Sequence, residues 1–187
     1  EHEATVTALI SIVKLHGVSD SYAETADMYQ DAVDRYTEDY GDKHPQTMRL
    51  ISTLASTLSF LEKRVEAEVL YRKVYESKEE VFGQEQLETL SAIVPLSRVL
   101  TDLGRYQEAE ELLRYKLKTT TDVYGDAHPA TLQSMVDLGE ILVLHKNYVE
   151  ADVILEEAMN KHEDIFGEVH SKTLLLVLRW GEWLNGD

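Results

Sequence analysis

Histidines recur along this chain at a spacing that raises the question of metal binding. Each falls at the same place in a nine-residue string that returns every 42 residues, as in residues 124–132 (YGDAHPATL), and the histidines concerned are His2, His44, His128 and His170. Imidazole nitrogens are common zinc ligands. Residues 42 positions apart would lie on successive repeats, too far apart for one ion, and Gln86 takes the place of His in the third copy. We therefore favour helix capping over a metal site, and we predict neither a metal nor a cofactor.

Basic side chains form the second candidate for chemistry. Lys14, Arg49, Arg98 and Arg179 stand among small or apolar residues in helical stretches of otherwise low charge. An arginine can hold a carboxylate through two hydrogen bonds, so this row could clamp a peptide with acidic and apolar side chains. The same row could equally be the ordinary charge that keeps a helix soluble.

Residues for catalysis are few. The adjacent acid pairs Glu110-Glu111 and Glu156-Glu157 would point in different directions from a helix, so we interpret them as solvated surface rather than as a general acid and base. No H-E-x-x-H, no G-x-S-x-G and no cysteine occur. We predict that the chain is not an enzyme. The alternative is a small-molecule pocket shaped by Arg98 and Glu140, which would need to be deep and enclosed.

The repeated string itself predicts where helices end and begin. Gly41, Gly83, Gly125 and Gly167 each follow an aromatic residue, and glycine takes the left-handed conformation that ends a helix. Proline after the histidine is favoured at the first position of a helix. Apolar residues between the strings follow helical spacing over 129–146 and 148–166, with a short link between the two stretches. Each repeat is therefore predicted to be a helix–turn–helix hairpin that buries its apolar stripe against its neighbours, and the fold class is all-α.

Two further strings carry a family resemblance. Residues 106–113 (YQEAEELL) and 65–71 (VEAEVLY), joined to G-x-x-H-P-x-T-L, resemble the 42-residue tetratricopeptide repeats of the kinesin light chain type. The resemblance implies a right-handed superhelical solenoid of antiparallel helix pairs with about nine helices. It covers the whole chain as one array, with repeats at about 1–42, 43–84, 85–126 and 127–168 and a partial fifth at 169–187. We expect the chain to be a piece of a longer protein.

The resemblance also implies a function, namely protein–protein interaction through a concave groove lined by the first helix of every pair. The partner would be a protein or peptide, acidic and apolar if the basic row binds it. The groove residues that we predict are Lys14, Arg49, Ser52, Ser56, Ser91, Val94, Arg98, Val136, Glu140 and Arg179. The family usually carries Asn at the positions held here by Thr53, Pro95 and Asp137, which argues against a kinesin light chain identity and its cargo specificity. The alternative is a regulatory or self-assembly segment of a larger signalling protein, forming a homodimer through Trp180 and Trp183.

Charge is distributed unevenly between the helices. The chain has a net charge of −17. The predicted first helices, residues 3–17, 45–62, 87–104, 129–146 and 170–185, carry seven acids and six bases, whereas the rest carries 28 acids and 12 bases. Such a balance argues against nucleic acid and anionic membrane surfaces as partners. No apolar run is long enough for a membrane span, and the absence of cysteine fits a cytoplasmic location.

One residue breaks the helical pattern. Pro95 lies about eight residues inside a predicted first helix, where it removes a backbone hydrogen bond to the carbonyl of Ser91. We expect a kink there. It is either strain that the array tolerates or a widened pocket around Ser91, Val94 and Arg98.

Overall fold

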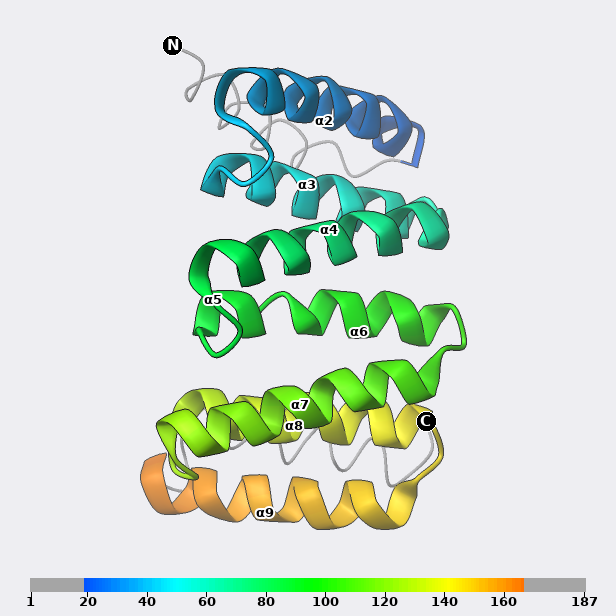
Figure 1. The fold of residues 1–187 in the computed structure, drawn as a ribbon. Helices are drawn as coiled ribbons and strands as arrows, with labels where there is room; N and C mark the ends of the chain where they lie inside the picture. Colours follow the sequence, from blue (N-terminus) through cyan, green and yellow to red (C-terminus); the bar gives the residue numbers. More distant parts are fainter. Residues whose placement is uncertain (1–18, 167–187) are drawn as a thin grey trace. The chain divides into compact units, whose positions relative to one another are not determined.

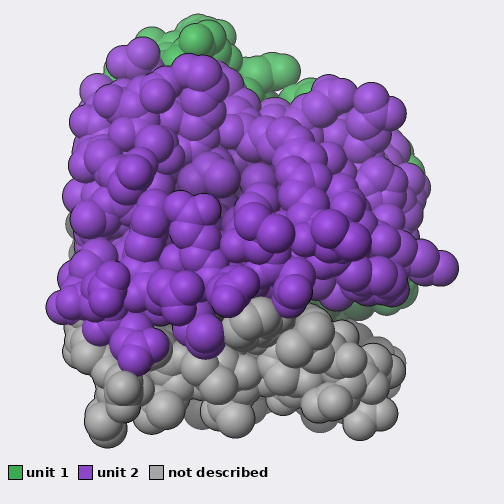
Figure 2. Space-filling model, turned by 90° about the horizontal axis from the view of Figure 1, so that it is seen from below, with its two compact units in different colours: residues 1–84 green, residues 85–187 purple. Residues whose placement is uncertain are grey.

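The computed structural model describes residues 19–166 of the chain, and all regular structure in this part is helical (Figure 1). The helices are α2 (Ser19–Tyr40), α3 (Pro45–Phe60), α4 (Arg64–Phe82), α5 (Leu87–Leu90), α6 (Ile93–Asp102), α7 (Tyr106–Tyr124), α8 (Pro129–Leu144) and α9 (Tyr148–Phe166). The chain divides into two compact units, residues 1–84 and 85–187, coloured separately in Figure 2. The boundary coincides with the one predicted between the second and third repeats.

In unit 1, α3 packs against both α2 and α4. Its apolar residues at helical spacing, Leu50, Ile51, Leu54 and Leu58, are all buried. The two neighbouring helices bury residues of their own, such as Tyr29 of α2 and Val74 of α4. Burial raises the pKa of the Tyr29 phenol. This half of the described chain therefore has a core built around one first helix.

In unit 2, α7 packs against α6 and α8, and α8 packs against α9. Because α8 has a helix on each side, nearly all of its residues from Thr131 to Leu142 are buried. Gly139 allows the closest approach: a Cβ at this position would lie 2.5 Å from Cδ2 of Leu155 on α9. A residue without a side chain therefore lets α8 and α9 approach each other closely at this point.

His44 and His128 of the repeated string cap helices, as predicted, whereas His2 and His170 lie outside the described residues. Nδ1 of His44 accepts the N–H of Gln46 at 3.3 Å, and Nδ1 of His128 accepts the N–H of Ala130 at 3.1 Å. These bonds satisfy a backbone donor that the first turn of a helix leaves without a partner. Each histidine is followed by proline at the start of its helix.

The threonine of the string has its own role. The hydroxyl of Thr131 donates to the carbonyl of Gly125 at 2.8 Å, which ties the start of α8 to the end of α7. Thr47, Thr89 and Thr131, 42 residues apart, are all at most 1% exposed. The hydroxyl of Thr47 likewise donates back to α2, to the carbonyl of Tyr36 at 3.4 Å, so in these two connections the threonine contacts the chain that precedes its helix.

The glycines of the string differ from the prediction in one respect. Gly83 and Gly125 end their helices with φ of 94° and 87°, but with ψ of 160° and 164°. This is an extended region that only glycine occupies readily, and not the left-handed region that we predicted. A Cβ there would meet no atom within 4 Å, so the backbone conformation and not the space around it requires glycine.

The left-handed cap lies instead in the turn inside each helix pair. Glu62, Gly104 and Lys146, again 42 residues apart, have φ of 61°, 76° and 64°. The next N–H reaches back five residues, as from Asn147 to the carbonyl of Leu142 at 2.8 Å, which is the Schellman arrangement. Two of these three positions are not glycine and so carry conformational strain.

Where a kink was predicted near Pro95, the helix is interrupted. The helix expected over 87–104 is divided into α5 and α6, with Ser91 and Ala92 between them. The N–H of Ala92 bonds to the carbonyl of Thr89, three residues back, at 3.0 Å. Pro95 has no N–H to offer to the carbonyl of Ser91, which explains the break four residues before it.

The described residues hold seven of the nine predicted helices if α5 and α6 count as one. The predicted helices at 3–17 and 170–185 lie outside the described residues, together with Lys14, Arg179, Trp180 and Trp183. The handedness of the array stays a prediction.

Candidate functional site

In unit 1 the predicted groove residues share one face of α3. Arg49, Ser52 and Ser56 follow helical spacing, with Arg49 exposed and the two serines half-buried. The hydroxyl of Ser52 donates to the carbonyl of Met48 at 3.0 Å. Arg49 makes no ion pair with any described residue. This face therefore presents a cation without an ion-pair partner among residues 19–166, beside small polar side chains.

In unit 2 three of the predicted residues come together at a small hollow between α6 and α8. Val94 and Arg98 line it from α6, and Glu140 lines it from α8. We call this space the α6–α8 hollow; its other lining residues are Ser97, Leu113, Asp137 and Ile141. Its volume of about 20 Å³ is room for roughly one water molecule. The guanidinium of Arg98 is exposed and makes no ion pair within the described residues.

Two predicted residues do not line this hollow. Val136 is 3% exposed and belongs to a core cluster with Leu132, Met135 and Ala158. The face of α8 that carries Val136 is thus covered by other helices, and the prediction that it lies in an accessible groove is wrong. Ser91 is exposed in the break between α5 and α6, where its hydroxyl donates to the carbonyl of Glu88 at 2.7 Å.

A buried ion pair forms one wall of the hollow. Nζ of Lys116 on α7 lies 2.5 Å from Oδ2 of Asp137, and the two side chains are 9% and 10% exposed. Nε2 of Gln133 donates to the other carboxylate oxygen at 3.0 Å. Lys116 was not among the residues predicted from the sequence. Its counterparts one repeat away, Val74 and Ala158, are apolar, and a lysine at a core position was the signal that could have revealed it.

Ser97 supplies an unusual polar group to the same hollow. The residue is 1% exposed, and its hydroxyl has no hydrogen-bond partner. The residues 42 positions away on either side, Ala55 and Gly139, carry no hydroxyl. Packing therefore does not require a serine at this position.

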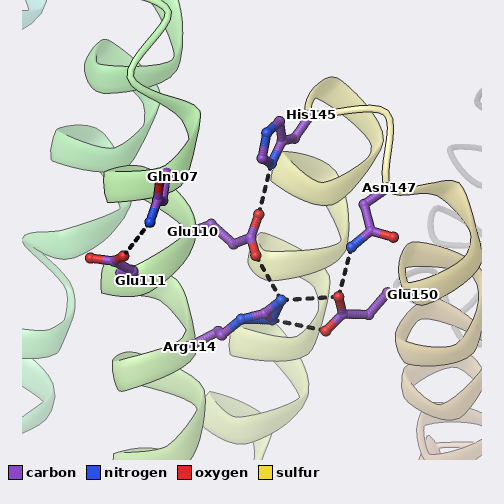
Figure 3. Close-up of polar contacts among 7 residues, drawn as sticks. All are labelled: Gln107, Glu110, Glu111, Arg114, His145, Asn147 and Glu150. Atoms are coloured by element: carbon purple, nitrogen blue, oxygen red, sulfur yellow. Dashed lines mark hydrogen bonds and ion pairs between the residues drawn. The ribbon is translucent and has the colours of Figure 1, made fainter.

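A second polar cluster joins α7 to the turn before α9, as Figure 3 shows. Arg114 bonds to Glu110 at 2.7 Å and to both carboxylate oxygens of Glu150 at 2.9 Å. Nδ1 of His145 lies 2.9 Å from Glu110, and its ring stacks on that of Tyr106 at 5.5 Å. We interpret this cluster as a clamp between adjacent helix pairs, since its groups are already partnered.

The prediction for the acid pair Glu110-Glu111 is confirmed for Glu111 and wrong for Glu110. The two side chains do point apart, because Glu111 accepts from Gln107 instead. Glu111 is exposed, but the Glu110 side chain is only 16% exposed and bridges Arg114 and His145. The interpretation of Glu110 as solvated surface is wrong, because a tertiary contact 35 residues away covers it.

Other perturbed groups lie outside the hollow. The hydrogen bond and charge of Glu80 raise the pKa of Lys43, and those of Asp122 raise the pKa of Lys118. Among residues 19–166, no cluster of three or more potential metal ligands occurs. Within the same range, no helix combines the length and the apolar composition needed to cross a bilayer.

Comparison with known proteins identifies the repeat. A family model described as tetratricopeptide repeat matches residues 4–80 and 88–164. The chain belongs to the tetratricopeptide repeat family. No match was found among curated protein sequences.

Solved structures of tetratricopeptide arrays share the fold. A Podosopora anserina putative kinesin light chain with nearly identical TPR-like repeats superposes with a TM-score of 0.76 at 19% identity, covering 86% of this chain and 76% of that one. A variant of that protein with a single glutamine-to-methionine substitution superposes with a TM-score of 0.78 at 19% identity, covering 94% of this chain and 83% of that one. BtubC (BKLC) from P. vanneervenii superposes with a TM-score of 0.74 at 16% identity, covering 98% of this chain and 74% of that one. The fold is thus that of kinesin light chain-like tetratricopeptide arrays.

Tetratricopeptide repeats generally mediate protein–protein interaction and are typically not catalytic. The hairpin geometry explains why: each pair offers its first helix to one surface, and neighbouring pairs extend that surface. In this tetratricopeptide chain, α3, α6 and α8 are the first helices of their pairs.

Proposed function

We propose that the chain is a protein-interaction module that binds a peptide segment of its partner on the accessible faces of its first helices. In unit 2 the contact surface is the α6–α8 hollow with Arg98 at its edge. In unit 1 it is the face of α3 that carries Arg49, Ser52 and Ser56. Acidic side chains of the partner pair with the two arginines, and apolar ones contact Val94.

The proposal is based on two arginines, Arg49 and Arg98, that have no ion-pair partner among residues 19–166. Most basic side chains among residues 19–166 take part in ion pairs or other polar contacts, as expected where acids are in large excess. The exceptions in this range are Arg35, Arg49, Arg98 and Lys146. Two of the four lie on first-helix faces that the sequence analysis predicted as binding surface. A free guanidinium beside apolar and small polar groups suits recognition of a carboxylate.

The proposal is tested by selecting a ligand and then reversing one charge. A phage-displayed library of random dodecapeptides is panned on the full chain, and the affinity of a selected peptide is measured by fluorescence anisotropy. We expect Arg98→Glu to weaken binding at least about tenfold, the order expected when one partner of a charge-assisted contact is replaced by a repelling charge. Raising the salt concentration should weaken binding of the unaltered chain.

Arg35→Glu is the matched control. Arg35 is also exposed and without an ion pair among the described residues, but it lies on α2, a second helix. The same change of net charge there should alter affinity less than about twofold, since exposed charges far from a ligand are screened. Equal losses in the two variants, or no selected peptide at all, would count against the proposal.

A further inference from the structure

We infer that the α6–α8 hollow is a subsite for one neutral carboxamide, the side chain of an Asn or Gln in the bound partner. The inference rests on the proposed function and sharpens it. Arg98 at the edge of the hollow favours acidic residues in general, whereas the interior selects a single uncharged residue.

Charge balance inside the hollow excludes an ionised ligand group. Arg98 and Glu140 line it with opposite charges, and Asp137 is neutralised by Lys116 at 2.5 Å. A carboxylate entering the hollow would meet the guanidinium of Arg98 but also two carboxylates, and an ammonium group would meet Glu140 but also the guanidinium, so neither ion finds a net opposite charge. Desolvation adds to either penalty, because a small buried space screens charge poorly.

A primary carboxamide matches the groups that line the hollow. Its oxygen can accept from the guanidinium of Arg98, and its two N–H groups can donate to carboxylate oxygens on α8. Asp137 retains acceptor capacity, because each of its oxygens receives one bond, from Lys116 or from Gln133, and a carboxylate oxygen offers about two acceptor positions. Leu113 and Ile141 supply apolar walls for the flat faces of the amide.

The hydroxyl of Ser97 points to an absent partner. Other helical hydroxyls in the described residues, such as those of Ser52, Thr101 and Ser134, donate to the carbonyl four residues back. That of Ser97 makes no such bond although it is fully buried. Leaving a buried hydroxyl unpaired is costly, and alanine serves at the equivalent position 55. A ligand amide that bonds to this hydroxyl accounts for both facts.

The hollow as it stands is smaller than a carboxamide, so its rim must widen to admit one. About 20 Å³ is enough for a water molecule, and the guanidinium of Arg98 at the edge is exposed and without an ion pair in the described residues, so it can move aside. A carboxamide entering the hollow would therefore displace one water and shift the Arg98 side chain outward, with the guanidinium still donating to the amide oxygen at the mouth, and would leave the packed core in place.

The test uses peptides selected from the dodecapeptide library on the full chain. We expect Asn or Gln to be enriched at one position of the selected sequences. In the highest-affinity peptide, changing that residue to Asp or to Leu should weaken binding at least about tenfold, the order expected for losing hydrogen bonds to charged groups. In Ser97→Ala this discrimination should fall at least about threefold, while the protein becomes no less stable.

Ser77→Ala is the control variant, because it removes a buried hydroxyl on the second helix α4, outside the hollow, and should leave the discrimination unchanged. If peptides are selected and depend on Arg98 but show no carboxamide preference, this inference is overturned and the proposed function stands. An equal preference in Ser97→Ala and the unaltered chain also overturns it. If no peptide is selected, the proposed function fails and the inference fails with it.

Discussion

Removing Lys116 should destabilise the protein strongly, and removing its ion-pair partner as well should restore most of the loss. Lys116→Met keeps a long unbranched side chain but leaves Asp137 buried with one remaining hydrogen bond, from Gln133. Breaking a buried ion pair on one side costs about 3–5 kcal/mol. The bond from Gln133 stays in place, so we expect the lower end, about 3 kcal/mol of the free energy of unfolding.

The double variant Lys116→Met/Asp137→Leu removes both charges and fills the space with apolar groups. Replacement of a buried pair in this way is often neutral or stabilising. Because Asp137→Leu also removes the acceptor of Gln133, we expect the double variant to lie within about 1 kcal/mol of the unaltered chain. Asp137→Leu alone leaves Lys116 buried without its partner and should also destabilise, so the coupling energy from the two single variants and the double variant is at least about 2 kcal/mol.

The assay is urea unfolding of the full chain, followed by far-ultraviolet circular dichroism. Exposed Lys118→Met is the matched control on the same helix, since its ion pair with Asp122 is solvated and should contribute little to stability. Losses that simply add in the double variant, or a loss in Lys116→Met no larger than in the control, would refute the argument that burial makes this pair a stability determinant.

Three further changes test the packing and the turns, each by the same urea measurement. Gly139→Ala should destabilise by about 1 kcal/mol, because overpacking against Leu155 costs more than the gain in helix propensity; in a Leu155→Ala background it should stabilise instead, and a stabilising effect in both backgrounds would contradict the close contact. Lys146→Gly should raise stability by about 0.5–1 kcal/mol, because it relieves a left-handed backbone conformation; a loss would show that the turn is unstrained. His128→Ala should cost about 1 kcal/mol by removing the cap of α8, and no change would mean that the bond contributes nothing.

Most of the fold could be predicted from the sequence because the residues that begin and end each helix act on backbone groups close to them in the chain. The bonds from His128 and Thr131 reach only two and six residues along the chain, so their 42-residue recurrence is enough to place each helix end. Pro95 likewise acts on a carbonyl four residues away. The predicted backbone conformation of the glycines was wrong in part: a positive φ was predictable for Gly125, but its ψ was not.

The candidate site was predictable only in part, since it depends on contacts distant in sequence. Arg98 and Glu140 could be assigned to first helices by periodicity. Whether a given side chain is accessible depends on how many helices cover its face, which is why Val136 was misplaced in the groove. The unpaired hydroxyl of Ser97 and the neutralisation of Asp137 by a lysine 21 residues away have no signature in a periodic pattern.

Photo-crosslinking tests the central claim, peptide binding on the first helices, most directly. A selected dodecapeptide carrying a photoreactive benzoylphenylalanine is irradiated with the full chain, and the attachment points are mapped by mass spectrometry. We expect crosslinks to α3, or to α6 and α8 around Val94, Arg98 and Glu140, and an excess of unlabelled peptide should abolish them. Competed crosslinks confined to the second helices α2, α4, α7 and α9 would contradict the claim.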